Sequence, residues 1–226
     1  MNIDYRLLLA LNGSDSIFCD SVMWDISRVG LWLPLYAILV MVVWRNNKWR
    51  EAMFIYLAIA VTILMADQIA SGVMKPYFHR LRPTHDPLIG DMIDTVRDYR
   101  GGLYGFCSSH ASNTFALATF MTLLMRHLWL SVSLFGWASV CSYSRMYLGV
   151  HFPSDVLCGA LLGVACALFV YGTLVFIKSY LPSTTGYYSS AFTSTGYQRH
   201  DILWPILTLF LTIIYTLFHA AFSVFL

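Results

Sequence analysis

The chain has 226 residues, of which 58% are hydrophobic and only 12% are charged, and its formal net charge is +2. Soluble domains carry about 25% charged residues, so this composition argues against a soluble protein and predicts a membrane protein. The cations are scattered or lie beside carboxylates, which argues against nucleic-acid binding.

Six apolar blocks follow one another along the chain. A helix that crosses the apolar core of a bilayer, about 30 Å thick, needs ~17 to 25 residues. The blocks cover residues 29–44, 52–72, 109–125, 129–148, 154–177 and 202–226. We therefore predict an all-α, polytopic membrane protein built as a bundle of six transmembrane helices.

The segment before the first block is expected to lie at the membrane interface. Arg6 is followed by only a short apolar run, residues 7–11, with no clear cleavage region of a signal peptide. Residues 3–11 fit a short interfacial helix better. Because nearly all of the remaining chain belongs to the six helices and their connections, we predict a single transmembrane domain over residues 1–226.

Counting Lys and Arg near the helix ends does not orient this bundle, because both sides carry several cations. The short loop 45–51 concentrates Arg45, Lys48 and Arg50. If some cations on the opposite side bind a ligand, this loop is the better marker of the cytoplasmic face. Both termini are then expected to face away from the cytoplasm.

In helices of alternating direction, all of the unusual polar residues fall at one membrane face. They lie after the second helix, at the start of the third, at the end of the fourth and around the start of the fifth. The residues are Lys75, Arg82, Ser108, Ser109, His110, Arg145, His151 and Asp155.

The cations of this set point to a phosphate ligand. Lys75, Arg82 and Arg145 match the charge of a phosphate monoester, and the planar fork of arginine suits phosphate oxygens. The start of the third helix adds backbone N–H groups and its dipole, with the Ser108 hydroxyl as a further donor. The sequence therefore predicts an anion site.

Two histidines and a carboxylate can supply a reaction at that site. One imidazole can attack phosphorus while the other protonates the leaving alkoxide. Asp155, four residues after His151, can accept its ring N–H and leave the other nitrogen free to attack. The cations would also stabilise charge on the transferring phosphoryl group.

Three stretches resemble, in order and spacing, the motifs of the type 2 phosphatidic acid phosphatase superfamily. Residues 75–83 (KPYFHRLRP) are similar to its KxxxxxxRP motif, 107–110 (CSSH) to PSGH, and 144–155 (SRMYLGVHFPSD) to SRxxxxxHxxxD. The second stretch has Cys107 in place of Pro and Ser109 in place of Gly. This departure concerns the local backbone and the pocket shape, because the catalytic Ser and His are retained.

The resemblance implies a six-span lipid phosphatase that works through a phosphohistidine and without a metal or other cofactor. His151 would be the nucleophile, Asp155 its orienting partner and His110 the general acid. The phosphate would be held by Lys75, Arg82, Ser108, Ser109 and Arg145. A phospholipid or polyprenyl phosphate in the bilayer is the expected substrate, and no protein partner is predicted.

The N-terminal stretch, residues 8–27 with Asn12, Gly13 and Asp20, is similar to that of bacterial undecaprenyl diphosphate phosphatases of this superfamily. We therefore expect undecaprenyl diphosphate as the substrate. The expected location is a bacterial inner membrane, with the active site facing the periplasm or exterior. The alternatives are a lipid A phosphatase and a phosphatidylglycerophosphate or phosphatidic acid phosphatase.

Three further residues are candidates for support of the site. Asp67 lies about two turns before Lys75, and either supports the cations from beneath or makes a helix-packing hydrogen bond. His79 and Arg80 either contact the head group or are simply solvated. The loop 84–106 is either a lid over the site or an interfacial connection.

Other classes of function are less consistent with the sequence. A vanadate-dependent haloperoxidase has a similar anion pocket, but those relatives are soluble. A non-catalytic lipid-binding or transport protein would not need a complete nucleophile, acid and orienting group. A zinc site built from Cys107, His110, His151 and Asp155 lacks the usual ligand spacing, so no metal ligand is predicted.

Overall fold

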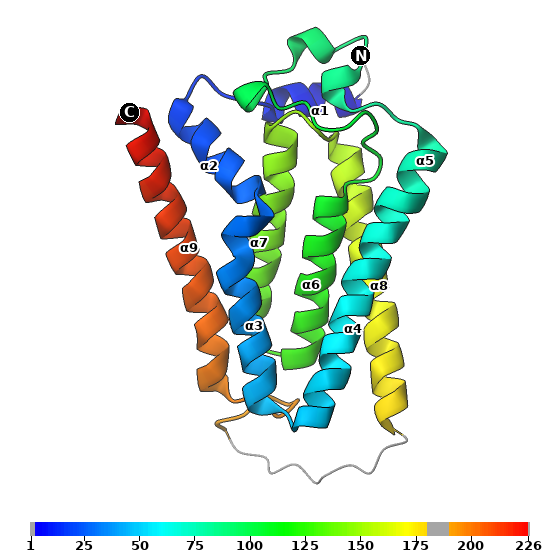
Figure 1. Cartoon of the computed structure of the whole chain (residues 1–226), viewed down its shortest axis with the longest axis vertical. Coiled ribbons are helices and arrows are strands. Elements are labelled where there is room, and N and C mark those ends of the chain that lie inside the picture. The colour runs from blue at the N-terminus through cyan, green and yellow to red at the C-terminus, as the bar shows by residue number, and fades with distance from the viewer. Residues whose placement is uncertain (1–2, 180–189, 226) are drawn as a thin grey trace.

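The computed structural model describes residues 3–179 and 190–225. In these ranges the structure is all-helical, as predicted, and the long helices run side by side between two ends of the molecule (Figure 1). The α-helices are α1 Ile3–Leu11, α2 Ile17–Ser27, α3 Leu33–Asn46, α4 Trp49–Asp67, α5 Lys75–Phe78, α6 Ser109–Met125, α7 Leu128–Tyr147, α8 Pro153–Ser179 and α9 Arg199–Phe225. The single domain over residues 1–226 stays a prediction, since its last residue, Leu226, lies outside the described ranges.

Four helical stretches are long and apolar enough to cross a bilayer, namely Val29–Asn46, Trp49–Phe78, Pro153–Ser179 and Arg199–Val224. The chain is thus an integral membrane protein. Between these stretches lie α6, with 17 residues, and α7, with 20. α6 packs against α4, α7 and α8. A helix that is surrounded by other helices, as α6 is, does not need an apolar surface on every side. The count of six transmembrane helices stays a prediction.

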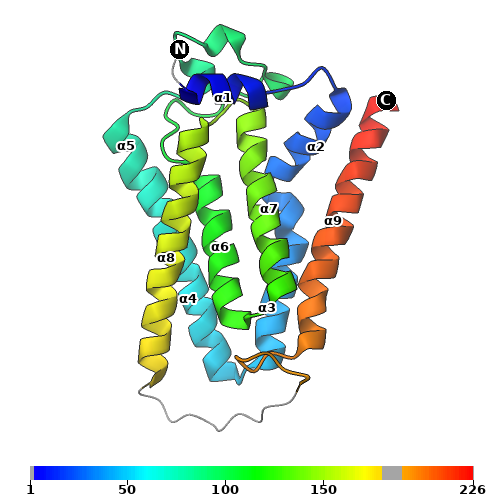
Figure 2. The same ribbon diagram turned by 180° about the vertical axis from the view of Figure 1, so that it is seen from behind.

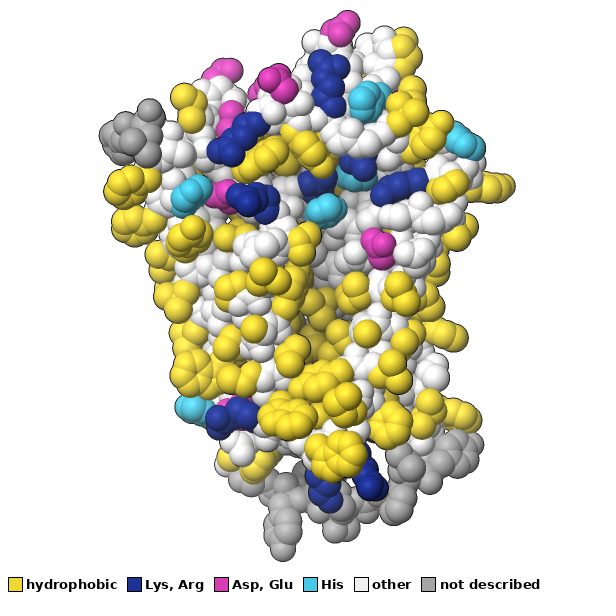
Figure 3. All heavy atoms as spheres, viewed as in Figure 1, with side chains coloured by type: hydrophobic (Ala, Val, Ile, Leu, Met, Phe, Trp, Pro, Cys, Tyr) yellow, Lys and Arg dark blue, Asp and Glu magenta, His cyan; other side chains and the backbone are white. Residues whose placement is uncertain are grey.

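The face of the molecule in Figure 3 carries a broad apolar band between two ends that bear most of its charged side chains. Large apolar side chains are more than half exposed on α4, α8 and α9, among them Leu57, Leu161 and Phe210. Soluble monomers rarely expose contiguous apolar surface on this scale. This surface is suited to contact with lipid tails.

The second long helix extends further than predicted. α4 continues through the π-helical turn Gln68–Met74 into α5, so Lys75 lies within a helix rather than in a turn after residue 72. The predicted end of this helix was wrong. In the wider π turn the N–H of Lys75 donates to the carbonyl of Ala70. This turn accommodates Pro76, which has no N–H to donate within the helix. The helix ends at His79, whose φ of 47° is left-handed.

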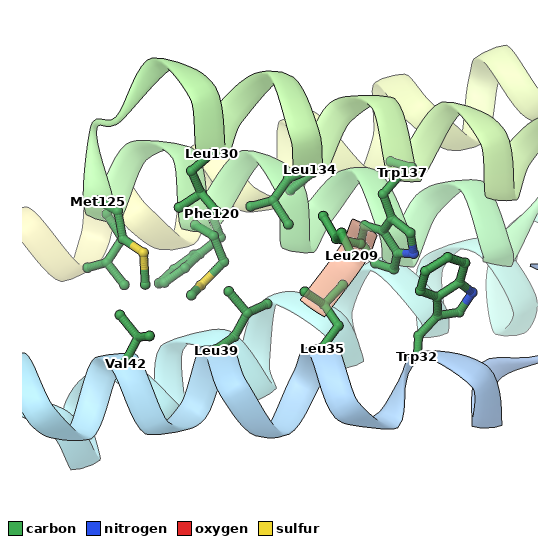
Figure 4. Packing of buried hydrophobic residues seen from close by; sticks show 14 of the residues in the cluster. Trp32, Leu35, Leu39, Val42, Phe120, Met125, Leu130, Leu134, Trp137 and Leu209 are labelled. Carbon is green, nitrogen blue, oxygen red and sulfur yellow. The ribbon is translucent and has the colours of Figure 1, made fainter. Parts of the chain in front are cut away.

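The main core forms where α3 meets α6 and α7 (Figure 4). Leu35, Leu39 and Val42 recur at the spacing of one helix face and pack towards Phe120 of α6. Trp32, before α3, meets Trp137 of α7 edge-on at 5.7 Å between ring centroids. These contacts hold α3 against the inner helices.

α6 and α8 approach each other closely because of two glycines one turn apart. A Cβ atom added at Gly159 or Gly163 would lie 2.4 Å from the carbonyl oxygen of Ser108 or 2.1 Å from that of Ser112. Small residues spaced in this way let membrane helices pack backbone to backbone. The N–H of Ser108 also donates to the carbonyl of Asp155 at 3.0 Å. The starts of α6 and α8 are therefore held in register.

α1 and the loop 84–106 lie across one end of the bundle, at which the N- and C-termini are also drawn (Figures 1 and 2). The Asn12 side chain donates to the carbonyls of Asp94 and Tyr147 and accepts from the N–H of Asp94. Tyr5 donates to Asp86 at 2.9 Å. The loop is thus tied down over this end. The interfacial position of α1 and any lid motion of the loop stay predictions.

Candidate active site

The helix ends beneath α1 bring the predicted residues together. Lys75 begins α5, Ser108 is the N-cap of α6, and Arg145 lies in the last turn of α7. His151 lies two residues before α8, and Asp155 lies in the first turn of this helix. The charges of Lys75 and Arg145 both act on His151. The expected convergence on one face is therefore present in the fold.

His151 is almost fully enclosed, with 1% of its surface exposed, and its two ring nitrogens face different partners. Nε2 lies 3.2 Å from Nη1 of Arg82, and Nδ1 lies 3.7 Å from Oδ2 of Asp155. Arginine can only donate, so Nε2 accepts and the ring proton is on Nδ1. The nitrogen that faces the cations therefore carries a lone pair.

Burial, followed by the positive charges of Arg82 and Arg145, lowers the pKa of His151 well below its ordinary value of 6.5. We expect NMR of histidine-labelled protein, with His151→Gln to assign the signal, to show an imidazole that stays neutral as the pH falls through 6.5. A His151 signal that shows a protonated ring at pH 6.5 would contradict this expectation.

The three cations of the site form no ion pair with a carboxylate among the residues that the structure describes. Apart from the contact of Arg82 with the His151 ring, their hydrogen bonds go to hydroxyl groups and backbone carbonyls: Ser71 and Ser109 for Lys75, Tyr104 and Val150 for Arg82, Ser27 and Tyr99 for Arg145. Arg145 is 4% exposed. Enclosed positive charges of this kind are costly unless an anion binds among them.

The start of α6 completes the site. The Ser108 hydroxyl accepts from the N–H of Ala111 at 3.5 Å, and the Ser109 hydroxyl accepts from Nζ of Lys75 at 2.7 Å. The positive charges of the same three cations also act on His110. Ser109 thus lies beside a cation of the site, and binding of phosphate by the two serines stays a prediction.

The three residues expected to support the site have different positions. Asp67 accepts from the amide of Asn113 at 3.2 Å, and its charge also acts on Lys75, so both of the alternatives given for it stay predictions. The His79 ring packs edge-on against Tyr104 at 5.0 Å. Arg80 contacts a predicted catalytic residue directly: its Nη1 donates to Oδ1 of Asp155 at 2.7 Å.

Sequence reasoning missed three residues that hold the charged groups. Ser27 and Tyr99 both accept from Arg145, and Asp4 accepts from Arg80. Each lies more than 40 positions from its partner, and no local pattern marks it. In the described ranges no three His, Cys, Asp or Glu side chains are grouped so that they could hold a metal ion.

A model of the PAP2 superfamily matches residues 54–178, more than half of the chain. The chain belongs to this superfamily. The three motifs between residues 75 and 155 lie inside the matched region, so the predicted family is confirmed. The predicted enzyme class, a lipid phosphatase, is confirmed with it.

Curated relatives extend the match. A lipid A 4'-phosphatase of Bacteroides thetaiotaomicron is 40% identical over 72% of this chain and 72% of its own length. Another of that name, from Porphyromonas gingivalis, is 32% identical over 79% of this chain and 76% of its own. An undecaprenyl-diphosphatase of Sulfolobus acidocaldarius is 28% identical over 71% of this chain and 69% of its own. Both lipid A 4'-phosphatases are thus more similar in sequence to this chain than the undecaprenyl-diphosphatase is.

The fold also matches a solved structure. The crystal structure of Aquifex aeolicus LpxE superposes with a TM-score of 0.58 and 22% sequence identity, over 76% of this chain and 96% of that one. At this identity the match concerns the fold alone. It agrees with the helical membrane architecture described above.

Proposed function

We propose that the chain removes a phosphate group from lipid A, or a closely similar phosphorylated glycolipid, through a phosphohistidine on His151. The observation that carries the proposal is the buried His151, whose Nε2 lies 3.2 Å from Nη1 of Arg82, one of three cations that form no ion pair with a carboxylate in the described structure. Such a pocket both attracts a phosphate monoester and places a nucleophile beside its phosphorus atom.

In the first step the Nε2 lone pair of His151 attacks phosphorus, and the bond from phosphorus to the ester oxygen breaks. His110 takes up a proton from solvent when the bound phosphate dianion offsets the charges of the three cations, and it gives this proton to the departing alkoxide of the lipid. Asp155, whose Oδ2 lies 3.7 Å from Nδ1 of His151, would accept the Nδ1–H as the two groups come within hydrogen-bond distance, and would stabilise the positive charge that forms on the ring. Lys75, Arg82 and Arg145 would balance the negative charge on the phosphoryl oxygens.

In the second step a water molecule attacks the phosphohistidine. His110, now neutral, accepts a proton from that water while the bond between phosphorus and Nε2 breaks. Inorganic phosphate leaves, and both histidines return to their starting protonation states. Lipid alcohol and phosphate are the products.

An apolar cavity beside the site supports a lipid substrate. It has a volume of about 510 Å³ and begins at Ser109 and His110. From there it is lined by side chains of α3, α4, α6 and α7, including Leu39, Ile63 and Leu117. Apolar walls of this kind suit an acyl chain, so a bound lipid would have its phosphate near His110 and a chain in the bundle.

The proposal also places the protein in its membrane. We propose that α3, α4 with its continuation, α6, α7, α8 and α9 all cross a bacterial inner membrane, with the site at the face away from the cytoplasm. Support comes from the short connection between α3 and α4 at the end of the bundle opposite α1 (Figure 1), where Lys48 caps α4 and Arg50 lies in its first turn. Cations in such short loops mark the cytoplasmic face.

Purified, detergent-solubilised protein is expected to prefer lipid A over other lipid phosphates. The panel is lipid A, undecaprenyl phosphate, undecaprenyl diphosphate, phosphatidylglycerophosphate and phosphatidic acid, with released phosphate as the readout. We expect kcat/KM for lipid A to exceed the others by about 10-fold or more, since a site built for one head group rejects analogues that leave its polar groups unpaired. A preference for undecaprenyl diphosphate would overturn the proposed substrate, and no release from any lipid would overturn the proposed function.

A further inference from the structure

The two carboxylate oxygens of Asp155 have different partners. Oδ2 accepts the N–H of Phe152 at 2.9 Å and faces Nδ1 of His151. Oδ1 accepts from Nη1 of Arg80 at 2.7 Å. The Asp155 side chain is 0% exposed, and a buried carboxylate needs a bonded cation to stay ionised. In the described part of the chain, Arg80 is the arginine that forms this ion pair.

The guanidinium of Arg80 is held on three sides. Nη1 also donates to the Ser154 hydroxyl at 2.6 Å, and Nη2 donates to Oδ2 of Asp4 at 2.5 Å. The group lies over the Phe152 ring, 4.2 Å from its centroid. A planar fork can bridge two carboxylates in one fixed geometry, whereas a lysine ammonium cannot.

The backbone places Arg80 and Arg82 on either side of the His151–Asp155 pair. The N–H of Gly105 donates to the carbonyl of Arg80 at 2.9 Å, and the N–H of Arg82 donates to the carbonyl of Leu103 at 3.0 Å. Arg82 meets Nε2 of His151, the nitrogen proposed to attack. Arg80 meets the carboxylate behind the ring, away from the position proposed for phosphate.

Asp4 connects helix α1 to this arrangement. Its Oδ1 accepts the N–H of Ser154 at 3.0 Å, and its Oδ2 accepts the Ser154 hydroxyl at 2.6 Å. A carboxylate at the N-terminus of a helix is stabilised by the helix dipole, and here the helix is α8, which carries Asp155. α1 lies over this end of α8 in Figure 2. Asp4 therefore holds both Arg80 and the start of α8.

We propose that Arg80 is a positioning residue, which acts through Asp155 to keep Nδ1–H of His151 directed at the carboxylate and Nε2 directed at phosphorus. Asp4 of α1 holds Arg80 in place for this role. The inference rests on the proposed function, because it needs His151 as the nucleophile. It assigns to α1 and to Arg80 a part in the reaction that the superfamily motifs do not include.

Steady-state kinetics of the purified full-length chain separate positioning from phosphate binding. In Arg80→Gln we expect kcat to fall by roughly 10- to 100-fold, as for other residues that orient a reacting histidine. KM and the Ki of inorganic phosphate should stay unchanged, because Arg80 does not touch the phosphate. Arg80→Lys should recover part of kcat, and Asp4→Asn should lower kcat by a smaller factor. The exposed Arg100 offers the matched control Arg100→Gln, which should behave as wild type.

A double-mutant cycle gives the decisive result. If Arg80 acts through Asp155, then Arg80→Gln should cost almost nothing in an Asp155→Ala background. Losses in kcat that multiply would overturn the inference, as would an increase in KM and in the Ki of phosphate. Unchanged kcat in Asp4→Asn would overturn the part assigned to α1. Activity that persists in His151→Ala would instead overturn the proposed function, so the two failures are distinguishable.

Discussion

Replacing His151 by alanine should lower phosphate release from every substrate by roughly 10⁴-fold or more, because the nucleophile is lost. The loss should be as complete with p-nitrophenyl phosphate as with lipid A. Released phosphate measures the rate. Mass spectrometry of alkali-quenched wild-type protein should find the phosphoryl group on His151.

His110→Ala provides the comparison that separates the two histidines. A general acid contributes about 10²- to 10⁴-fold, so lipid hydrolysis should fall within that range. Hydrolysis of p-nitrophenyl phosphate should fall much less, since its phenolate leaves without needing a proton. If His151→Ala retained activity on p-nitrophenyl phosphate while His110→Ala lost it, the two roles would be reversed.

Gly163→Ala should severely destabilise the bundle, although it adds a single methyl group. The new Cβ would lie 2.1 Å from the carbonyl oxygen of Ser112 and 2.9 Å from the N of Ala116. Both contacts are backbone atoms, so α6 and α8 must move apart. We expect a loss of about 3 kcal/mol or more in the free energy of unfolding, at the upper end of overpacking effects. The apparent Tm in detergent, at a fixed scan rate, measures it.

Gly172→Ala is the matched control on the same helix. A Cβ at Gly172 would meet no atom within 4 Å, and alanine favours the helix over glycine. Its Tm should therefore equal or slightly exceed that of the wild type. Gly163→Ala should also lose activity, since the Ser108–Asp155 backbone bond depends on close packing of α6 and α8. Equal Tm values for the two variants would contradict the packing argument.

Local chemistry explains why much of this protein can be predicted from its sequence. The bilayer sets the length of an apolar helix, and α6 begins and ends where its apolar block does, at Ser109 and Met125. Alternating helix direction then places the motif residues at one face. The exception is the second helix, where the π-helical turn before Lys75 carries the helix past the predicted end.

The partners of the charged residues could not be predicted, because they come from distant parts of the chain. Arg82 is a predicted phosphate ligand through its motif, whereas by sequence Arg80 either contacts the head group or is simply solvated. The packing of α1 and α8 around Arg80 shows its partners, with Asp4 and Asp155 on its two sides.

The sequence by itself therefore determined the membrane class, the superfamily and the residues proposed for the chemistry of His151, since these depend on composition and on short spacings. The tertiary structure decided which nitrogen of His151 faces the cations, that the three cations have neutral partners, and which arginine holds Asp155. Those features depend on which side chains are buried together, and burial is a property of the packed helices rather than of any segment.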